Sequence, residues 1–231
     1  MSWKVLTAMV ASALLASTAI IWSQPKWRYL LQSQAVFTVE RLTGLPLHPA
    51  PSLSSTPWAT DLINSAASQI GVTVNYDPAY VALSYPNGDI PRRDGVCTDV
   101  VIRALRDAHQ IDLQERVHQD MSARFASYPN HWGLTRPDSN IDHRRVPNLR
   151  RYFEHIGAAL PAPTLQSDFQ PGDIITWKIA PGRPHIGIVS DRTSRDGSRP
   201  LILHNAGLGT RLDDFLPLYP MTGHYRLEGH L

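Results

Sequence analysis

Apolar residues repeat at intervals of three and four in two segments of the chain, and each segment predicts a helix. The first segment, "PWATDLINSAASQIG", has Pro57 at its start and Gly71 at its end, which are typical helix boundary residues. Its apolar positions are Leu62, Ile63, Ala66, Ala67 and Ile70. We therefore expect a capped helix between these two boundaries.

The second segment follows Cys97 and has the clearest helical pattern of the chain. Its apolar positions are Val100, Val101, Ala104, Leu105, Ala108 and Ile111, while Arg103, Arg106 and Asp107 fall on the opposite face. Cys97 therefore lies at or just before the first turn of this helix. Asp94, three residues earlier, is a candidate N-cap.

The stretch "PGDIITWKIAPGRPHIGIVSD" has the pattern of two strands joined by a turn. A Pro-Gly-Asp turn precedes a strand from about Ile174 to Ile179, and "APGRP" turns the chain into a second strand that starts at His185. The turn in "RDGSRP" then leads into "LILHNAG". Together these segments predict an antiparallel meander.

Three polar residues of the meander are placed by strand geometry. His185 stands at a strand entrance beside a tight turn, where its ring can face a cleft. On the next strand, His204 and Asn205 must point to opposite faces of the sheet, because side chains alternate along a strand. Only one of the two can therefore share the face of His185.

The first 57 residues predict a leader or anchor and a linker. Residues 5–22 carry no charge, and Lys26 and Arg28 follow them, which is the pattern of a secretory signal or an uncleaved membrane anchor within residues 1–26. Residues 27–57 are rich in Pro and Ser and predict a linker. The remaining domain, 58–231, is expected outside the cytoplasm, either periplasmic or otherwise extracytoplasmic, and secreted or anchored to the inner membrane.

Composition narrows the classes of function. Hydrophobic residues make up 42% and charged residues 18% of the 231 residues, which is typical of a globular domain. A formal charge of +2, with no basic stretch interleaved with aromatics, argues against nucleic-acid binding. The single cysteine excludes an internal disulfide and a structural zinc site built on two thiolates. A free thiol in an oxidising compartment is a liability, so its presence calls for a reason.

The position of Cys97 leaves two interpretations open on the residues alone. It is either a small buried apolar side chain or a nucleophile. The positive end of a helix favours a thiolate, which would lower the pKa of Cys97 and make its sulfur reactive at neutral pH. A nucleophile needs a base, and His185, oriented by a polar residue on the next strand, could be that base.

This order of Cys, His and a polar residue resembles the NlpC-type superfamily of papain-like cysteine peptidases, which mostly cut peptide bonds in bacterial peptidoglycan. The family's Tyr-x-x-Gly pattern is matched by "YPNG" with Tyr85, its Pro-Gly-Asp turn by "PGDII", and its catalytic strand by "HIGIV". A closer resemblance is to the YijF-like proteins, a domain family of unknown function in this group. The stretches that carry it include "GVTVNYDPAY", "YPNGDIPRRDGVCTDVVIRALR", "WGLTRPDSNIDHRRVPNL" and "HNAG".

The resemblance implies an α+β, papain-like fold in which a nucleophile helix packs on an antiparallel sheet. It implies Cys97 as the nucleophile, His185 as the general base and His204 as the orienting residue, with Asn205 as the alternative. The backbone N–H of Cys97 would contribute to an oxyanion hole, and the Tyr85 hydroxyl would line the same cleft. The reaction would pass through a thioester and would need no metal or other cofactor.

Two departures from the superfamily pattern stand out. Most relatives have Asp-Cys-Ser at the nucleophile, whereas this chain has Val-Cys-Thr-Asp, and the segment "NIDHRRVPNLRRYFEHIG" has no counterpart in the usual peptidoglycan enzymes. A polar cluster opens that segment before a short predicted helix, and it comprises Asn140, Asp142, His143, Arg144 and Arg145. The cluster is either a loop held by an Asp–Arg pair or a substrate wall on which Arg144 or Arg145 binds a carboxylate.

The sequence therefore predicts an extracytoplasmic, monomeric cysteine hydrolase that acts on peptidoglycan stem peptides or a related cell-wall amide. Two alternatives remain. One is a non-catalytic envelope module that binds glycan or protein on the same fold. The other is a zinc hydrolase that draws ligands from His131, His143, His155, His185 and His204, although no H-E-x-x-H motif is present.

Overall fold

The structure is a computed structural model, and it describes residues 39, 53–165 and 168–231. The chain divides into two compact units, Met1–Leu47 and His48–Leu231, and the elements below belong to the second. The predicted membrane segment and most of the predicted linker lie outside the described residues. Within the described part, none of the helices is long and apolar enough to span a bilayer.

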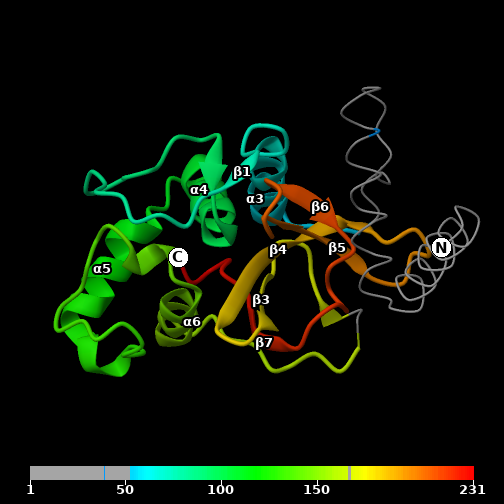
Figure 1. The fold of residues 1–231 in the computed structure, drawn as a ribbon. Helices are drawn as coiled ribbons and strands as arrows, with labels where there is room; N and C mark the ends of the chain where they lie inside the picture. The colour runs from blue at the N-terminus through cyan, green and yellow to red at the C-terminus, as the bar shows by residue number, and fades with distance from the viewer. Residues whose placement is uncertain (1–38, 40–52, 166–167) are drawn as a thin grey trace, which may run out of the picture. The chain divides into compact units, whose positions relative to one another are not determined.

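Among the residues that the structure describes, four α-helices and two short 3-10 helices form the helical part of the domain (Figure 1). Thr56 caps the first, α3 (Pro57–Ser68), by accepting a hydrogen bond from the N–H of Ala59 at 3.1 Å. The others are α4 (Cys97–His109), α5 (Leu113–Arg124), η1 (Phe125–Ser127), η2 (Asp142–Arg144) and α6 (Val146–His155). Helices predicted before Gly71, after Cys97 and after the polar cluster are thus present.

A five-stranded antiparallel sheet forms the other half of the domain, in the order β6-β5-β4-β3-β7. The strands are β3 (Ile174–Ala180), β4 (Arg183–Thr193), β5 (Pro200–His204), β6 (Arg211–Asp213) and β7 (Met221–Tyr225). The first three form the predicted antiparallel meander, which is confirmed. A separate parallel pair, β1 (Asn75–Tyr76) and β2 (Asp94–Gly95), lies just before α4 in the chain. The fold is therefore of mixed α+β class.

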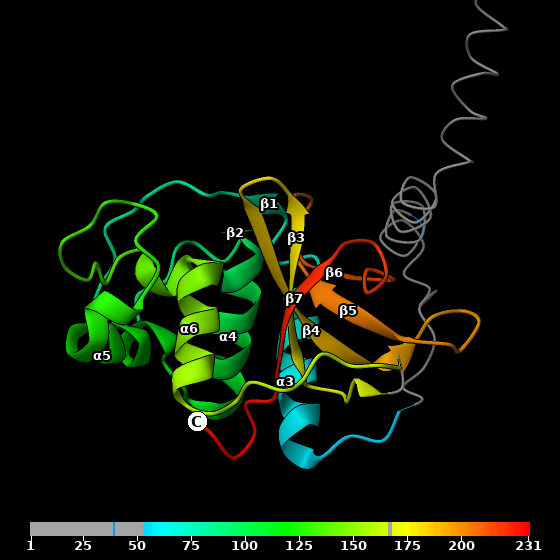
Figure 2. The same ribbon diagram turned by 90° about the horizontal axis from the view of Figure 1, so that it is seen from below.

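The sheet buries a different core on each face. On one face, Ile186 and Ile188 of β4 pack with residues of α3, α4, α5 and α6, and Figure 2 shows α4 and α6 on that side of the sheet. On the other face, Val189 packs with Trp177 and Phe215. Because side chains alternate along a strand, successive residues of β4 pack into different cores.

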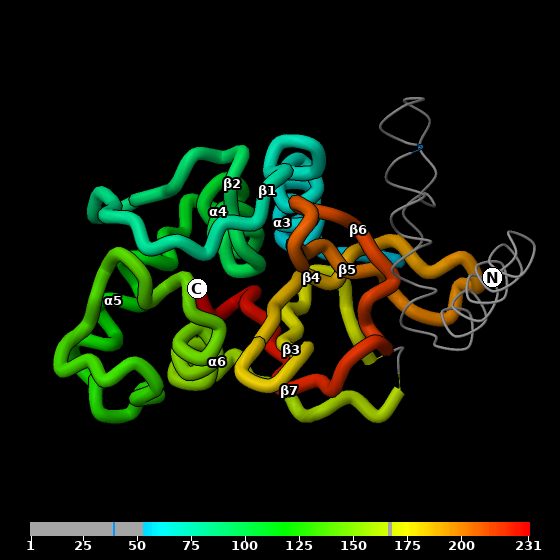
Figure 3. The backbone as a smooth tube through the Cα atoms, viewed as in Figure 1, coloured from blue at the N-terminus to red at the C-terminus, as the bar shows by residue number. Residues whose placement is uncertain are grey.

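The segment between β1 and β2 covers the charged face of α4. It leaves β1, extends toward α5 and returns to β2, just before α4, as Figure 3 shows. Arg103 is completely buried beneath it, holds the carboxylate of Asp89 through Nε and Nη2, and donates to the carbonyls of Ile90 and Asp94. The polar face of α4 is therefore buried, and through Arg103 it holds in place the segment that leads to Cys97.

Candidate active site

Cys97 is the first residue of α4 and is buried. The residue before it, Val96, is the extended N-cap, and the carboxylate of Asp99 accepts its N–H at 2.7 Å. Asp94, the candidate N-cap, instead lies in β2, where its carboxylate accepts from the amide of Asn75 at 2.7 Å. The prediction that Asp94 is the N-cap is wrong. The N-cap is Val96, and the Asp99 side chain, in the first turn of α4, accepts its N–H, so no side chain before the helix is needed for capping.

The sulfur of Cys97 lies among hydrogen-bond donors. The backbone N–H groups of Ile186, Thr98 and Cys97 itself point to it, and the hydroxyl of Tyr76 lies within hydrogen-bonding reach. Tyr76 belongs to β1 and pairs with Gly95, two residues before the cysteine. Its side chain is 40% exposed, so the site reaches solvent through this tyrosine.

Burial dominates the protonation of the Cys97 thiol. Desolvation raises its pKa to about 12, and the nearby Asp99 acts in the same direction. The backbone N–H groups lower the pKa, as expected at a helix start, but they do not outweigh the desolvation. The resting side chain is therefore a neutral thiol, and the expected thiolate is corrected on this point.

His185 lies in β4 on the sheet face opposite α4. Its ring packs against Trp177 and Phe215, and its Nε2 is 2.9 Å from Nδ1 of His204 in a hydrogen bond. Burial, and secondarily His204, hold the pKa of His185 well below its usual value. The imidazole is therefore neutral and able to accept a proton, and Nδ1 is the ring nitrogen not used by His204.

A glycine makes the contact between the two histidines possible. Gly187, two residues after His185, lies within β4 where that strand faces β5, and a Cβ there would stand 2.6 Å from Cγ2 of Ile202 and 3.1 Å from Cβ of His204. Any side chain at this position would push β5 away. The His-x-Gly spacing in "HIGIV" therefore has a steric cause.

His204 has a second partner, which the sequence did not indicate. Its Nε2 lies 3.3 Å from Oδ2 of Asp213 in β6, an ion-pair distance with poor alignment for a hydrogen bond. Asp213 also lies 3.5 Å from the guanidinium of Arg211. No motif marks this aspartate, because its approach depends on how β6 pairs with β5.

Asn205 points away from the histidines and ties other elements together. Its amide donates to the carbonyls of Asn75 and Gly95 at 3.3 and 3.1 Å, and its oxygen accepts from the N–H of Gly207. Of the two residues considered for orienting the base, the structure brings His204 to His185. Asn205 instead connects the end of β5 to β1 and β2.

Tyr85 is not at the cysteine. Its side chain is 44% exposed and makes an edge contact with His118 of α5. The following residues are held at the same helix: Asn87 donates its N–H to Asp112 at 2.6 Å, and Gly88 donates to Gln114 at 2.8 Å. The expected position of Tyr85 is therefore corrected, and the hydroxyl beside Cys97 is that of Tyr76.

Most of the polar cluster at 140–145 is structural. Arg144 is buried, with Nε and Nη2 3.0 and 2.9 Å from the two carboxylate oxygens of Asp99. Asp142 is buried and accepts from the N–H of Asp138 and from Arg145. His143 is buried too, and burial lowers its pKa to about 4. Of the two interpretations of this cluster, the loop held by Asp–Arg pairs is therefore the one that fits Asp142, His143 and Arg144. None of these three side chains is exposed as a wall for a substrate.

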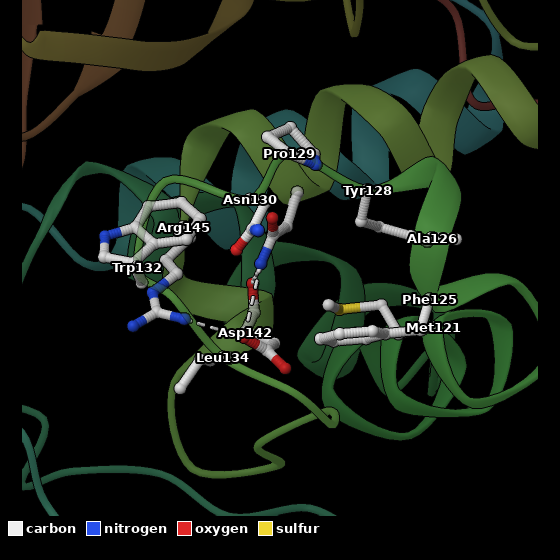
Figure 4. A pocket seen from close by; sticks show the side chains of 11 residues that line it. Met121, Phe125, Ala126, Tyr128, Pro129, Asn130, Trp132, Leu134, Asp142 and Arg145 are labelled. Carbon is white, nitrogen blue, oxygen red and sulfur yellow. Dashed lines mark hydrogen bonds and ion pairs between the residues drawn. The ribbon is translucent and has the colours of Figure 1, made fainter.

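Arg145 is the member of the cluster that reaches a cavity. Its guanidinium stacks on Trp132 at 3.9 Å and donates to Asp142 at 2.9 Å, as Figure 4 shows. The cavity has a volume of about 290 Å³ and an apolar wall that includes Met121 and Phe125. Arg145 thus remains available to a ligand, unlike its neighbour Arg144.

The side chains of Cys97 and His185 lie on opposite faces of the sheet, and the backbone of β4 runs between them. Cys97 accepts from the N–H of Ile186, which is bonded to the carbonyl carbon of His185, while the His185 ring lies on the other face. Among the described residues, no hydrogen bond joins the thiol to the imidazole, and no three metal-ligating side chains gather as a metal site. Catalytic hydrogen bonds are often long before substrate binds.

Fold and site together define an α+β protein in which a cysteine at a helix start contacts the backbone of β4, and a hydrogen-bonded pair of histidines lies on β4 and β5. The chain belongs to the family described as "Domain of unknown function (DUF1287)", whose model matches residues 63–227. It is 53% identical over 197 residues to "Uncharacterized protein YijF" of Escherichia coli (strain K12), a match that covers 85% of this chain and 95% of the relative. The expected membership of a YijF-like family is confirmed.

A solved structure of NlpC2 from Trichomonas vaginalis is similar to the chain at a TM-score of 0.37 and 14% identity. The match covers 78% of this chain and 49% of that one, so the chain spans about half the length of the solved protein. At this level the likeness carries no argument about activity.

Proposed function

We propose that the protein is an extracytoplasmic cysteine hydrolase that cleaves an amide bond of bacterial peptidoglycan through a thioester. The observation that carries the proposal is the hydrogen bond between His185 and His204, on the strand whose next residue, Ile186, contacts the buried thiol of Cys97 through its backbone N–H. A neutral imidazole with one nitrogen already oriented is the arrangement that a general base requires. The resemblance of the motifs to NlpC-type peptidases supports the same chemistry.

The protonation states favour general-base catalysis over a preformed ion pair. Because the pKa of the thiol is raised and that of His185 is lowered, the resting pair is neutral. As substrate binds, the thiol proton passes to Nδ1 of His185 and the sulfur adds to the amide carbonyl carbon. Proton transfer and carbon–sulfur bond formation are thereby coupled.

The same residues would carry out the remaining steps, which are release of the amine and hydrolysis of the thioester. The oxyanion formed on the carbonyl oxygen is stabilised by the N–H of Cys97 and the hydroxyl of Tyr76. His185 returns the proton to the nitrogen as the carbon–nitrogen bond breaks, which releases an amine and leaves a thioester on Cys97. Water, deprotonated by His185, then hydrolyses the thioester, which gives a carboxylate and restores the thiol.

Arg145 supplies a candidate contact for an acidic substrate. Its Nη1 is used by Asp142, whereas Nε and Nη2 have no hydrogen-bond partner within the described residues. In Arg144, Nε and Nη2 bind the two oxygens of Asp99. The Nε–Nη2 edge of a guanidinium can therefore bind a carboxylate, and in Arg145 this edge is open. Stem peptides of peptidoglycan carry carboxylates, and we propose Arg145 as a residue that recognises one.

The test is incubation of the full-length protein, as wild type and as Cys97→Ala, with purified peptidoglycan, followed by mass spectrometry of the released fragments. We expect fragments with new carboxyl and amino groups from the wild type alone, insensitive to a metal chelator and abolished by a thiol-alkylating reagent. Circular dichroism of both proteins controls for folding. Identical fragments from both proteins would contradict the proposal, and binding of peptidoglycan without fragments would favour the envelope binding module.

A further inference from the structure

Asp213 stands at the end of a line of polar atoms that begins at the ring of His185. The line runs from Nδ1 of His185 through its Nε2 to Nδ1 of His204 at 2.9 Å, and from Nε2 of His204 to Oδ2 of Asp213 at 3.3 Å. Both histidines are about 1% exposed, so water cannot replace these partners. His204 therefore has a polar neighbour at each ring nitrogen, and the ring of His185 has one at Nε2, and these neighbours decide which nitrogen carries the proton.

A carboxylate can only accept, and this fixes the first imidazole. If Nε2 of His204 carried a lone pair, that lone pair would face the negative charge of Asp213 and repel it. With a single proton on the ring of His204, that proton therefore lies on Nε2, toward Asp213, and Nδ1 is left as an acceptor. The 3.3 Å separation is longer than a good hydrogen bond, but the direction of the electrostatic preference is the same.

The second imidazole follows from the first. Because Nδ1 of His204 accepts, Nε2 of His185 must carry the proton in their 2.9 Å hydrogen bond. Nδ1 of His185 is then a lone pair, which is the state that can take the proton of Cys97. The opposite arrangement, with Nδ1 of His204 protonated, would place the proton of His185 on Nδ1 and block that step.

We propose that Asp213 is a positioning residue that sets the proton tautomer of His204 and, through it, keeps Nδ1 of His185 ready to accept the thiol proton. The assignment of tautomers stands without any reaction, while its link to thiol activation rests on the proposed function. Nη2 of Arg211 lies 3.5 Å from Oδ1 of Asp213, so a positive charge stands beside the carboxylate on the side away from His204 Nε2, which faces Oδ2. The ring of Phe215, with its centroid 4.2 Å from that of His204, is apolar and offers no competing donor or acceptor.

The experiment measures tautomers directly by nitrogen-15 NMR of the full-length protein, using the two-bond couplings of each imidazole. In the wild type we expect both His204 and His185 to carry their proton on Nε2. In Asp213→Leu, which removes the acceptor, we expect Nδ1–H forms to appear in both rings. Asp213→Glu restores a carboxylate and should restore the wild-type tautomers.

Alkylation of Cys97 by iodoacetamide at neutral pH provides the second readout. We expect its rate to fall about tenfold or more in Asp213→Leu, a smaller loss than the roughly ten-thousandfold effect of a wrong tautomer set by a direct partner of the base. The matched control is Asp214→Asn, because Asp214 pairs with Arg199 instead of a histidine and should leave the rate unchanged.

The outcomes separate this inference from the proposed function. Nδ1–H His204 in the wild type, or unchanged tautomers and alkylation in Asp213→Leu, would overturn the role of Asp213. The wild-type measurement needs no variant, so it decides the question even if Asp213→Leu fails to fold. Predicted tautomers in a protein that cleaves no peptidoglycan would uphold the role of Asp213 and contradict the hydrolase.

Discussion

Arg144 and Asp99 form a buried two-point ion pair, and Asp99 lies two residues after Cys97 in α4. Nε and Nη2 of Arg144 lie 3.0 and 2.9 Å from the two oxygens of Asp99, and Nη2 and Nη1 also donate to the carbonyls of Asp77 and Ala79. Asp99 acts on Cys97 by raising the pKa of its thiol. The arginine therefore neutralises a charge that would make Cys97 harder to ionise.

Arg144→Gln should weaken both the fold and the reactivity of the thiol. Removing one partner of a buried pair leaves the other charge unpaired, which costs about 3–5 kcal/mol of unfolding free energy. Alkylation of Cys97 at pH 8 should also slow, because the uncompensated Asp99 raises the thiol pKa further. Urea unfolding and iodoacetamide kinetics measure the two effects. Arg151→Gln breaks a partly exposed pair with Glu154 and should change both by much less.

The alkylation rate of Cys97 should rise with pH without a plateau below pH 10 in the absence of substrate. The thiol pKa is raised to about 12 by burial, so the thiolate fraction keeps growing through this range. Stability changes in the opposite direction: an unfolded thiol ionises near pH 8.5 and the folded one does not, so stability falls as pH rises above that value. A plateau near pH 7 would show a preformed thiolate. Cys97→Ser should remove the alkylation and this part of the stability loss.

His143 should make the domain acid-sensitive. Burial lowers its folded pKa from 6.5 to about 4, so its contribution to stability is present above pH 6.5 and is lost as pH falls toward 4. Between pH 7 and 5 the loss should be about 2 kcal/mol. The lowered pKa of His185 acts in the same direction. Urea unfolding of wild type and His143→Gln at both pH values measures it, with the exposed His131→Gln as control; equal slopes in all three proteins would refute the assignment.

Tyr76→Phe and Tyr85→Phe should have different effects on peptidoglycan cleavage. Tyr76 places its hydroxyl beside the sulfur, and loss of one oxyanion donor costs about a hundredfold or more in rate where it acts fully. Tyr85 contacts His118, so its hydroxyl should not contribute to the rate. The released fragments, quantified over time by mass spectrometry, distinguish the two variants. A large loss in Tyr85→Phe would contradict the arrangement described.

Local patterns predicted the elements well because their signals are local. The spacing of apolar residues after Cys97 and the turns around His185 were sufficient for α4 and for the meander. The face assignment of His204 and Asn205 followed from strand alternation alone. The residue that binds His185 could not be chosen between them from sequence, because the choice depends on strand register.

Residues missed by the sequence analysis depend on contacts between distant segments. Tyr76 reaches the sulfur because β1 pairs with β2, and Asp213 reaches His204 because β6 pairs with β5. Tyr85 has the spacing expected of a site residue, but the hydrogen bonds of Asn87 and Gly88 hold it at α5. Spacing along the chain could not reveal this attachment.

His204 and Asn205 are consecutive residues with contacts on opposite sides of the chain, so a change of length in the turn before β5 would disturb both sets of contacts. One residue faces the base, and the next holds the carbonyls of Asn75 and Gly95, which lie on the segments that carry Tyr76 and Cys97. A one-residue slip of β5 would turn each side chain to the other face of the sheet. An insertion or deletion in the "RDGSRP" turn that shifted β5 in this way would therefore remove two sets of contacts at once: the hydrogen bond of His204 to His185, and the hydrogen bonds of Asn205 to Asn75 and Gly95.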